Sequence, residues 1–245
     1  MITKPKATLR VKIASTITWL IMGSLIPVYF IIAYATFFLD NKTRHKILTT
    51  WGKIFIFFGK NLCGVNYEVL GQENLIKGPA IFASNHQSTW ETLAFNVFLP
   101  QHIWILKREL IRIPVFGWTL RVLSPIAINR SNKKSSVMQI LEQSKFKIHD
   151  GFWIMVFPEG TRLPPRAKHN YKTGVARMAL NLNLPVVPIA HNAGHIMPRR
   201  SFWLYPGKVV VRISKAIYPD NMTPEELTEK IRSTIYNELN EMGEI

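Results

Sequence analysis

The amino-acid sequence predicts an α/β domain, with a mainly parallel sheet flanked by helices, behind an N-terminal helical membrane anchor. The first observation is a stretch of 27 residues, 13–39, that contains no charged side chain and is mostly apolar. The second is that short, almost continuously hydrophobic runs alternate with longer helical stretches after Gly64. Such runs are typical of parallel strands covered by helices on both faces. We therefore divide the chain into an anchoring segment, 1–64, and a globular domain, 65–245.

The anchor is predicted from the length of the uncharged stretch. As a helix that rises about 1.5 Å per residue, residues 13–39 would extend roughly 40 Å, more than the ~30 Å hydrocarbon core. The apolar part of a cleaved signal peptide is only about 7–15 residues long, so we expect this segment to be retained.

Two arrangements of the anchor in the membrane are compatible with the sequence. Basic residues flank both ends of the stretch, so charge does not indicate an orientation. Pro27, near the centre, can kink or break a helix. A second apolar stretch, 47–65, combines aromatic side chains with Lys53 and Lys60, as interfacial helices do. A single span and a bent helical pair embedded in one leaflet, with both ends in the cytoplasm, both stay open.

The globular domain is predicted to contain seven strands and four helices. The strands are 67–70, 80–84, 103–106, 126–129, 152–157, 186–190 and 208–214. The helices are 88–98, 133–149, 172–183 and 224–241. The last helix follows Thr223 and begins with Pro224 and Glu226, a pattern typical of a capped helix start. No internal repeat or further domain is indicated.

Composition narrows the class of partner. The formal net charge is +16, which indicates nucleic acid, an acidic lipid surface or a phosphorylated metabolite. Segment 61–219 holds twenty basic against seven acidic residues, so we expect a basic surface on the body. A nucleic-acid binder fits the charge but not the anchor, and no interleaved aromatic and basic motif supports it. The single cysteine, Cys63, excludes an intrachain disulfide and a cysteine-rich zinc site, and we expect it to be buried or at an interface.

The expected ends of the strands gather polar residues. The carboxyl ends of parallel strands meet at one edge of a sheet, where such folds bind ligands. The residues that follow these ends are His86, Lys107, Arg130, Glu159 with Arg162, and His191 with Asn192. A histidine beside several cations predicts a pocket for a phosphate next to a proton acceptor, and His191 is expected to line it.

The first motif is Asn-His-Gln-Ser-Thr-Trp-Glu at 85–91. In one interpretation Glu91 only closes a helix start whose N-cap is Ser88. In the other, His86 takes a proton from an alcohol as its oxygen attacks a carbonyl, and Glu91 accepts a hydrogen bond from the second ring nitrogen. No enzyme serine is needed if the alcohol belongs to the substrate. Both interpretations of Glu91 stay open.

The second motif is Phe-Pro-Glu-Gly-Thr-Arg at 157–162. A carboxylate and an arginine at the exit of a buried strand cost stability unless they are paired or bind a ligand. Arg162 offers a planar fork that matches phosphate, Thr161 a hydroxyl, and Gly160 a close backbone approach. Glu159 positions Arg162 or Lys107, or bonds a substrate hydroxyl; a simple turn is the alternative for the whole segment.

Four segments together resemble, in order, the four sequence blocks of the glycerolipid acyltransferases, and most closely those of the bacterial 1-acylglycerol-3-phosphate acyltransferases. They are 85–91, 107–110 with Pro114 and 117–118, 157–162 and 186–190, within a match from about 65 to 215. The resemblance implies a glycerolphosphate acyltransferase-like fold and an acyltransferase domain at 65–245. One departure concerns the first block, where the family has His-x4-Asp and this chain has Glu91.

The resemblance also implies an activity. His86 would act as general base on the 2-hydroxyl of lysophosphatidic acid, with Glu91 as its partner and no covalent acyl-enzyme. Acyl carrier protein or coenzyme A would carry the acyl thioester as co-substrate, with no other cofactor and no metal. The product would be phosphatidic acid, in phospholipid biosynthesis at the cytoplasmic face of the inner membrane. Phosphate contacts are implied for the second and third blocks and their neighbours: Lys107, Arg112, Arg130, Glu159, Gly160, Thr161 and Arg162.

Two other functions stay open at this point. The same chemistry on another acceptor, such as glycerol-3-phosphate or a lyso-aminolipid, would use the same residues. A non-catalytic membrane protein that binds anionic lipid would need only the basic surface and the anchor. The remaining histidines with no matching block, His102, His149, His169 and His195, are expected to be at the surface or structural.

Overall fold

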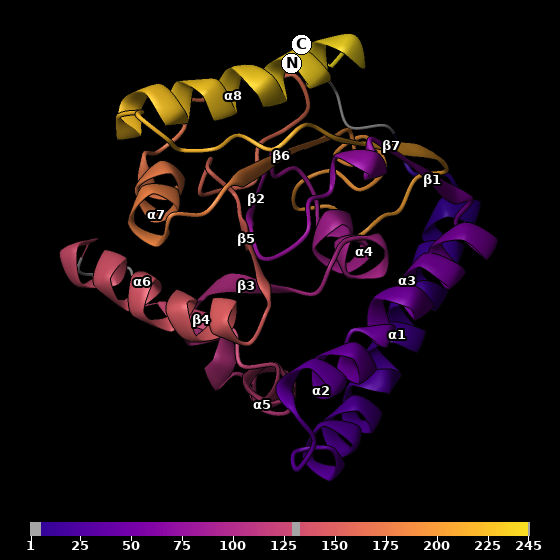
Figure 1. Cartoon of the computed structure of the whole chain (residues 1–245). Helices are drawn as coiled ribbons and strands as arrows, with labels where there is room; N and C mark the ends of the chain where they lie inside the picture. The colour runs from indigo at the N-terminus through magenta and orange to yellow at the C-terminus, as the bar shows by residue number, and fades with distance from the viewer. Residues whose placement is uncertain (1–5, 129–132, 245) are drawn as a thin grey trace.

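The computed structural model describes residues 6–128 and 133–244, with the side chains of 133–137 left aside, and has a seven-stranded sheet between layers of helices (Figure 1). The strands are β1 Val65–Leu70, β2 Ile81–Ser84, β3 His102–Lys107, β4 Ile126–Ile128, β5 Trp153–Val156, β6 Val186–His191 and β7 Gly207–Ile213. The α-helices are α1 Leu9–Ala35, α2 Asn41–Leu48, α3 Thr50–Asn61, α4 Trp90–Phe98, α5 Phe116–Val122, α6 Lys133–His149, α7 Gly174–Leu182 and α8 Pro224–Glu241. Two short 3-10 helices are η1 Gln72–Asn74 and η2 Arg108–Arg112.

The sheet is mainly parallel, as predicted. The strand order is β1-β7-β6-β2-β5-β3-β4, and the five strands from β6 to β4 run in one direction. β7 pairs antiparallel with β6, and β1 pairs parallel with β7, so these two edge strands run in the opposite direction. The carboxyl ends of β2, β3, β5 and β6 therefore meet at one edge, as the site prediction requires.

The predicted elements are found, with small differences at their ends. All seven strands occur within three residues of the expected positions, although residue 129 lies outside the described residues. α4 begins at Trp90 and α7 at Gly174, each two residues later than expected. α8 has the predicted capping box between Thr223 and Glu226. The short helix α5 was not predicted, because seven residues containing a glycine carry too weak a periodicity to distinguish it from a loop.

Both faces of the sheet are covered, which explains the continuous hydrophobic runs. In β2, Ile81 and Ala83 belong to the core beneath α7 and α8, whereas Phe82 belongs to the core beneath α4 and the N-terminal helices. The Phe82 ring stacks on that of Trp153 in the neighbouring strand β5, with centroids 4.4 Å apart. The side chains of β2 thus meet a helix layer on either face of the sheet.

The N-terminal helices pack on this body. α1 continues through Pro27, whose side chain is exposed, and it is long and apolar enough to cross a membrane by length and composition. Met22 of α1 and Phe55 of α3 lie in the same core as Phe82 and Trp90. Cys63 is buried as expected, with its Sγ 3.4 Å from the Thr18 hydroxyl.

The helix α3 approaches α4 very closely at Gly52. A Cβ atom at this position would lie 2.5 Å from the backbone oxygen of Leu93 and 3.5 Å from Val97 Cγ2. Only glycine lets the two helices approach so closely without a shift of the backbone. α4 starts directly after the His86 motif, so this crossing fixes the helix that supports the motif.

We predict that Gly52→Ala destabilises the protein by about 1–3 kcal/mol, because a buried methyl group must push α3 away from α4. Gly59 in the same helix is the matched control, because a Cβ there would meet nothing within 4 Å. Gly59→Ala is expected to be neutral or to stabilise by up to ~1 kcal/mol through helix propensity. Thermal unfolding of the purified variants in one detergent measures both, and equal shifts would contradict this packing.

Candidate active site

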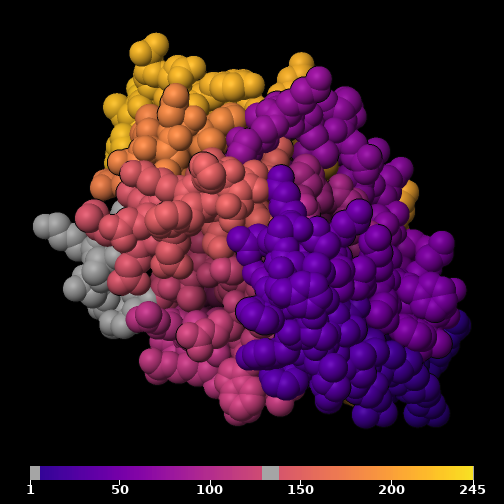
Figure 2. Space-filling model, turned by 60° about the horizontal axis from the view of Figure 1, so that its bottom comes forward, coloured from indigo at the N-terminus to yellow at the C-terminus, as the bar shows by residue number. Residues whose placement is uncertain are grey.

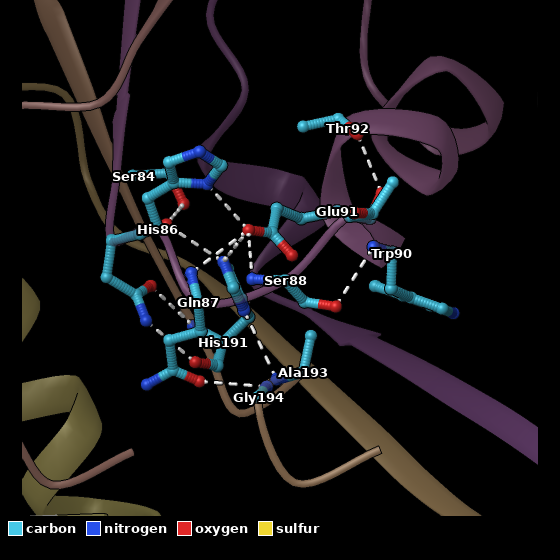
Figure 3. A network of polar contacts seen from close by, with 12 residues as sticks. Ser84, His86, Gln87, Ser88, Trp90, Glu91, Thr92, His191, Ala193 and Gly194 are labelled. Carbon is cyan, nitrogen blue, oxygen red and sulfur yellow. Dashed lines mark hydrogen bonds and ion pairs between the residues drawn. The ribbon is translucent and has the colours of Figure 1, made fainter. Parts of the chain in front are cut away.

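The carboxylate of Glu91 organises the loop between β2 and α4 (Figure 3). Its Oε1 accepts three hydrogen bonds: from His86 Nδ1 at 2.8 Å, from the Gln87 N–H at 3.0 Å and from the Ser88 N–H at 2.8 Å. The Ser88 hydroxyl accepts from the Trp90 N–H at 3.0 Å, but the N-cap of α4 is Thr89, not the predicted Ser88, and Thr89 makes no side-chain cap hydrogen bond. Glu91 therefore bonds both the backbone of the loop before α4 and the ring of His86.

Glu91 is completely buried, yet its surroundings favour the charged form. Burial alone would raise the pKa of this carboxyl. The nearby His191 and His86, with the hydrogen bonds from the His86 ring and the Ser88 N–H, outweigh burial and hold the pKa below its usual value. Glu91 is thus an ionised acceptor at neutral pH.

His86 is held in one orientation and one tautomer. Because a carboxylate only accepts, Nδ1 of His86 carries the hydrogen that points to Glu91. The ring stacks on Phe157, with centroids 3.8 Å apart and planes within 10°, and Phe157 stacks in turn on Trp104. The one hydrogen bond of the ring among the residues described is made by Nδ1, and the side chain is 15% exposed. Nε2 is thus placed to accept a proton if a substrate hydroxyl comes within reach.

The second motif and the residue after it form hydrogen bonds to the backbone of His86. β2 and β5 are neighbours, with Ala83 paired to Val156, so the segment that follows β5 lies beside the first motif. Glu159 Oε2 accepts from the His86 N–H at 3.0 Å, and the Leu163 N–H donates to the His86 carbonyl at 2.8 Å. Both backbone groups of His86 are thereby fixed by the segment that carries Gly160 and Arg162.

Glu159 differs from Glu91 in its ionisation. The pKa of Glu159 is raised to about 8, mainly by burial and in part by the charge of Glu91, although the hydrogen bond from the His86 N–H lowers it. Glu159 is thus largely protonated at neutral pH. A neutral carboxyl does not repel an anion, which explains how an acid can sit in a segment predicted to bind phosphate.

The cations of this segment have unused donors. Arg162 Nε is buried and has no hydrogen-bond partner among the residues described. Gly160 has φ of 69°, a conformation that favours glycine, and a Cβ there would lie 3.3 Å from Lys172 Nζ. Lys172 therefore belongs beside the predicted Gly160, Thr161 and Arg162. The sequence analysis missed it, since only the basic run 166–172 hinted at it and no motif spacing singled it out.

The other predicted cations are placed less closely. Lys107 ends β3 and Arg112 ends η2, both exposed, and neither has a hydrogen bond to His86 or Glu159 in the described part of the chain. Arg130 lies outside the described residues. Their roles as phosphate contacts stay predictions.

The expectation that His191 lines the pocket was wrong. His191 is fully buried, and its Nε2 donates to the carbonyl of Asn85 at 2.9 Å, beneath the loop rather than on its surface. Two further side chains, to which the sequence assigned no role, form hydrogen bonds here. Asn85 bonds the backbone of His191, and Gln87 accepts from the Gly194 N–H. The sequence signal for the buried position of His191 was a polar residue that directly continues the apolar run of β6.

Comparisons with known proteins agree with this arrangement. A family model described as Acyltransferase matches residues 66–192. The 1-acyl-sn-glycerol-3-phosphate acyltransferase of Pseudomonas aeruginosa is 38% identical over 192 residues, which cover 78% of this chain and 75% of that protein. The protein of the same name from Helicobacter pylori is 30% identical over 189 residues, which cover 74% of this chain and 78% of that protein.

A solved structure is similar over nearly the whole length. The crystal structure of the 1-acyl-sn-glycerophosphate (LPA) acyltransferase PlsC from Thermotoga maritima has a TM-score of 0.81 and 24% identity, and the match covers 96% of this chain and 97% of that one. This similarity bears out the predicted fold. By the family model and the sequence identity, the chain belongs to the acyltransferase family.

Proposed function

We propose that the protein transfers a fatty acyl group from an acyl thioester to the 2-hydroxyl of 1-acylglycerol 3-phosphate, giving phosphatidic acid. The observation that carries the proposal is the histidine of the site. Its Nδ1 is tied to the ionised Glu91, its Nε2 has no hydrogen bond among the described residues, and the adjoining segment carries the unpaired Nε of Arg162, with Lys172 Nζ beside Gly160. The names of the similar bacterial enzymes agree with this substrate.

The proposed step uses His86 as base and then as acid. As the hydroxyl oxygen of the acceptor attacks the thioester carbonyl, its proton moves to Nε2 and the new C–O bond forms. The imidazolium is stabilised by Glu91 through Nδ1–H. When the tetrahedral intermediate collapses, the C–S bond breaks and the thiolate takes the proton from Nε2. The base is regenerated, and no acyl group is attached to the protein.

The acceptor phosphate would bind beside this base. Arg162 supplies a guanidinium with an unpaired Nε, Lys172 an ammonium, and Thr161 a hydroxyl on the turn at Gly160. Protonated Glu159 can donate to a phosphate oxygen while its other oxygen holds the His86 N–H. We place Lys107, Arg112 and Arg130 as additional contacts, because they follow neighbouring strand ends.

The donor would be a thioester of acyl carrier protein or coenzyme A, which the basic surface would attract because both carriers are acidic. The chemistry as written requires neither a metal nor another cofactor. An acceptor such as glycerol-3-phosphate or a lyso-aminolipid would use the same step.

We propose further that α1 lies in the cytoplasmic leaflet of the inner membrane. Its outward side chains are apolar: Ile13 is 53%, Leu20 67%, Val28 46% and Ile31 65% exposed. Its other face packs on the body, with Met22, Tyr29 and Ala33 buried. Figure 2 shows the N-terminal segment, in indigo, as a continuous part of the surface. A helix perpendicular to the membrane would carry the packed body into hydrocarbon, which favours the embedded arrangement over a single span.

A basic pocket lies near the start of α1, where lipid headgroups would be. It has a volume of about 630 Å³, and its lining includes Lys6, Lys12, Arg200, Phe202 and Trp203. The loop that carries Phe202 is tied to α1, because Trp19 Nε1 donates to the Phe202 carbonyl at 2.8 Å. Cations and aromatic rings beside an apolar helix face fit a membrane surface of anionic lipid.

The function is tested by incubating the purified protein with 1-acylglycerol 3-phosphate and either acyl donor, followed by mass analysis of the lipid. We expect phosphatidic acid with at least one donor, and a loss of about 10³-fold or more for His86→Ala because the base is removed. Competition with glycerol-3-phosphate and a lyso-aminolipid identifies the acceptor. No phosphatidic acid with either donor, or full activity of His86→Ala, would refute the proposal.

The membrane placement predicts that Lys12→Gln with Arg200→Gln weakens binding to vesicles containing phosphatidylglycerol. Each headgroup-level cation contributes about 1 kcal/mol, so the double variant should lose about tenfold or more in partition coefficient. Lys215→Gln with Lys230→Gln is the matched control, because both are exposed; Lys215 follows β7, and Lys230 lies on α8, which is far from α1 in Figure 1. Sedimentation with vesicles measures both, and an equal loss in the two double variants would contradict this orientation.

A further inference from the structure

The first motif is joined to the turn after β6 by hydrogen bonds that the chemistry above does not use. β2 and β6 are parallel neighbours, with Ser84 paired to Ile189, so Asn85 lies beside His191. The Asn85 side chain extends the ladder: its Nδ2 donates to the His191 carbonyl at 2.8 Å, and its Oδ1 accepts from the His191 N–H at 3.0 Å. The residue directly before the catalytic base is therefore bonded on two sides.

The imidazole of His191 adds a third connection. Its Nδ1 accepts from the Ala193 N–H at 3.2 Å, which leaves the hydrogen on Nε2, and this N–H donates to the Asn85 carbonyl at 2.9 Å. The ring packs edge-on against Phe95 of α4, with centroids 5.7 Å apart. One side chain thus contacts the strand end, the turn and the helix that together enclose the first motif (Figure 3).

His191 also lies next to the acid of the catalytic pair. Its Nε2 is 4.0 Å from Glu91 Oε1, and both side chains are completely buried. The N–H end of a neutral imidazole is the positive end of its dipole, and between buried side chains its attraction to a carboxylate is stronger than in water. Burial lowers the pKa of His191, so the ring stays neutral and does not take a proton from Glu91.

We propose that His191 is a positioning residue for the transfer reaction: it holds the Asn85–His86 backbone and faces the Glu91 carboxylate, so that Nε2 of His86 points at the acceptor hydroxyl. The inference rests on the proposed roles of His86 and Glu91. Two separate consequences follow. Loss of the His191 ring donor should slow the chemical step, and it should leave acceptor binding nearly unchanged because His191 does not reach the phosphate segment.

The chain offers a matched control in His102. This side chain is also completely buried, has its Nδ1 2.8 Å from the carbonyl of Pro100, and packs edge-on against Phe82 at 5.9 Å. It differs from His191 in its position, because it begins β3 and makes no hydrogen bond to the His86 loop among the described residues; its ring packs on Trp104. A purely structural role for a buried histidine predicts similar effects at the two positions.

The experiment compares His191→Phe, His191→Gln and His102→Phe by kcat, by KM for the lysolipid acceptor and by Tm. We expect His191→Phe to lower kcat about 10- to 100-fold with KM within about twofold of wild type, because a small misplacement of a base has effects of this size. The Gln amide nitrogen reaches the position of Nε2, so His191→Gln should recover most of that loss. His102→Phe should change Tm but leave kcat within about twofold of wild type.

Three results would overturn the proposal: full kcat in His191→Phe, no recovery in His191→Gln, or an equal loss of kcat in His102→Phe. If His191→Phe does not fold, His191→Asn takes its place, because its shorter amide does not reach the Asn85 carbonyl. His86→Ala is measured in the same series. Full activity of His86→Ala would refute the proposed function itself, whereas an inactive His86→Ala with an active His191→Phe would refute only the role of His191.

Discussion

One carboxylate oxygen, Oε1 of Glu91, supports the local structure and the proposed chemistry together. The same atom accepts the N–H groups of Gln87 and Ser88, in the loop before α4, and the ring N–H of His86. Hydrogen bonds to a carboxylate oxygen are strongest when the carboxylate is charged and shielded from solvent. Glu91 meets both conditions, because it is fully buried and its pKa is held below the usual value. The loop conformation, the tautomer of His86 and the availability of Nε2 thus depend on one charge, which couples folding of the motif to readiness for proton transfer.

The sheet determines what surrounds that charge. β2 lies between β5 and β6 in the sheet. The segment after β5 is therefore hydrogen-bonded to the backbone of His86, and His191 at the end of β6 is hydrogen-bonded to Asn85. The two neighbouring acids are then set to different states. Glu91 is ionised by its donors, whereas burial raises the pKa of Glu159 to about 8, so that one acid stabilises the imidazolium and the other leaves room for an anion. The close crossing of α3 and α4 connects this arrangement to α3, which packs against α1, the helix that we place in the membrane.

Much of the fold was predictable from the sequence, since the central strands β2, β5 and β6 are largely apolar runs and α8 carries its capping box. His86, Glu91 and the 157–162 segment were identified because strand ends of a parallel sheet converge. Other features needed three-dimensional contacts. The buried position of His191 depends on which strand lies beside β2, and Lys172 reaches Gly160 across a loop without a motif. Periodicity does not report such contacts, and the ionisation of two glutamates with similar local sequence signals depends on burial and donors.

The most direct test of this account is the turnover of Glu91→Gln, measured with its Tm. Gln keeps an oxygen that can accept from the Gln87 and Ser88 N–H groups, but it carries no charge to stabilise the His86 imidazolium. The account predicts a fall in kcat of about 10²–10⁴-fold, by analogy with acid-to-amide changes in catalytic triads, in a protein that remains folded. Wild-type turnover in a folded Glu91→Gln protein would show that Glu91 is only a helix cap, and would contradict the catalytic role assigned here to the His86–Glu91 pair.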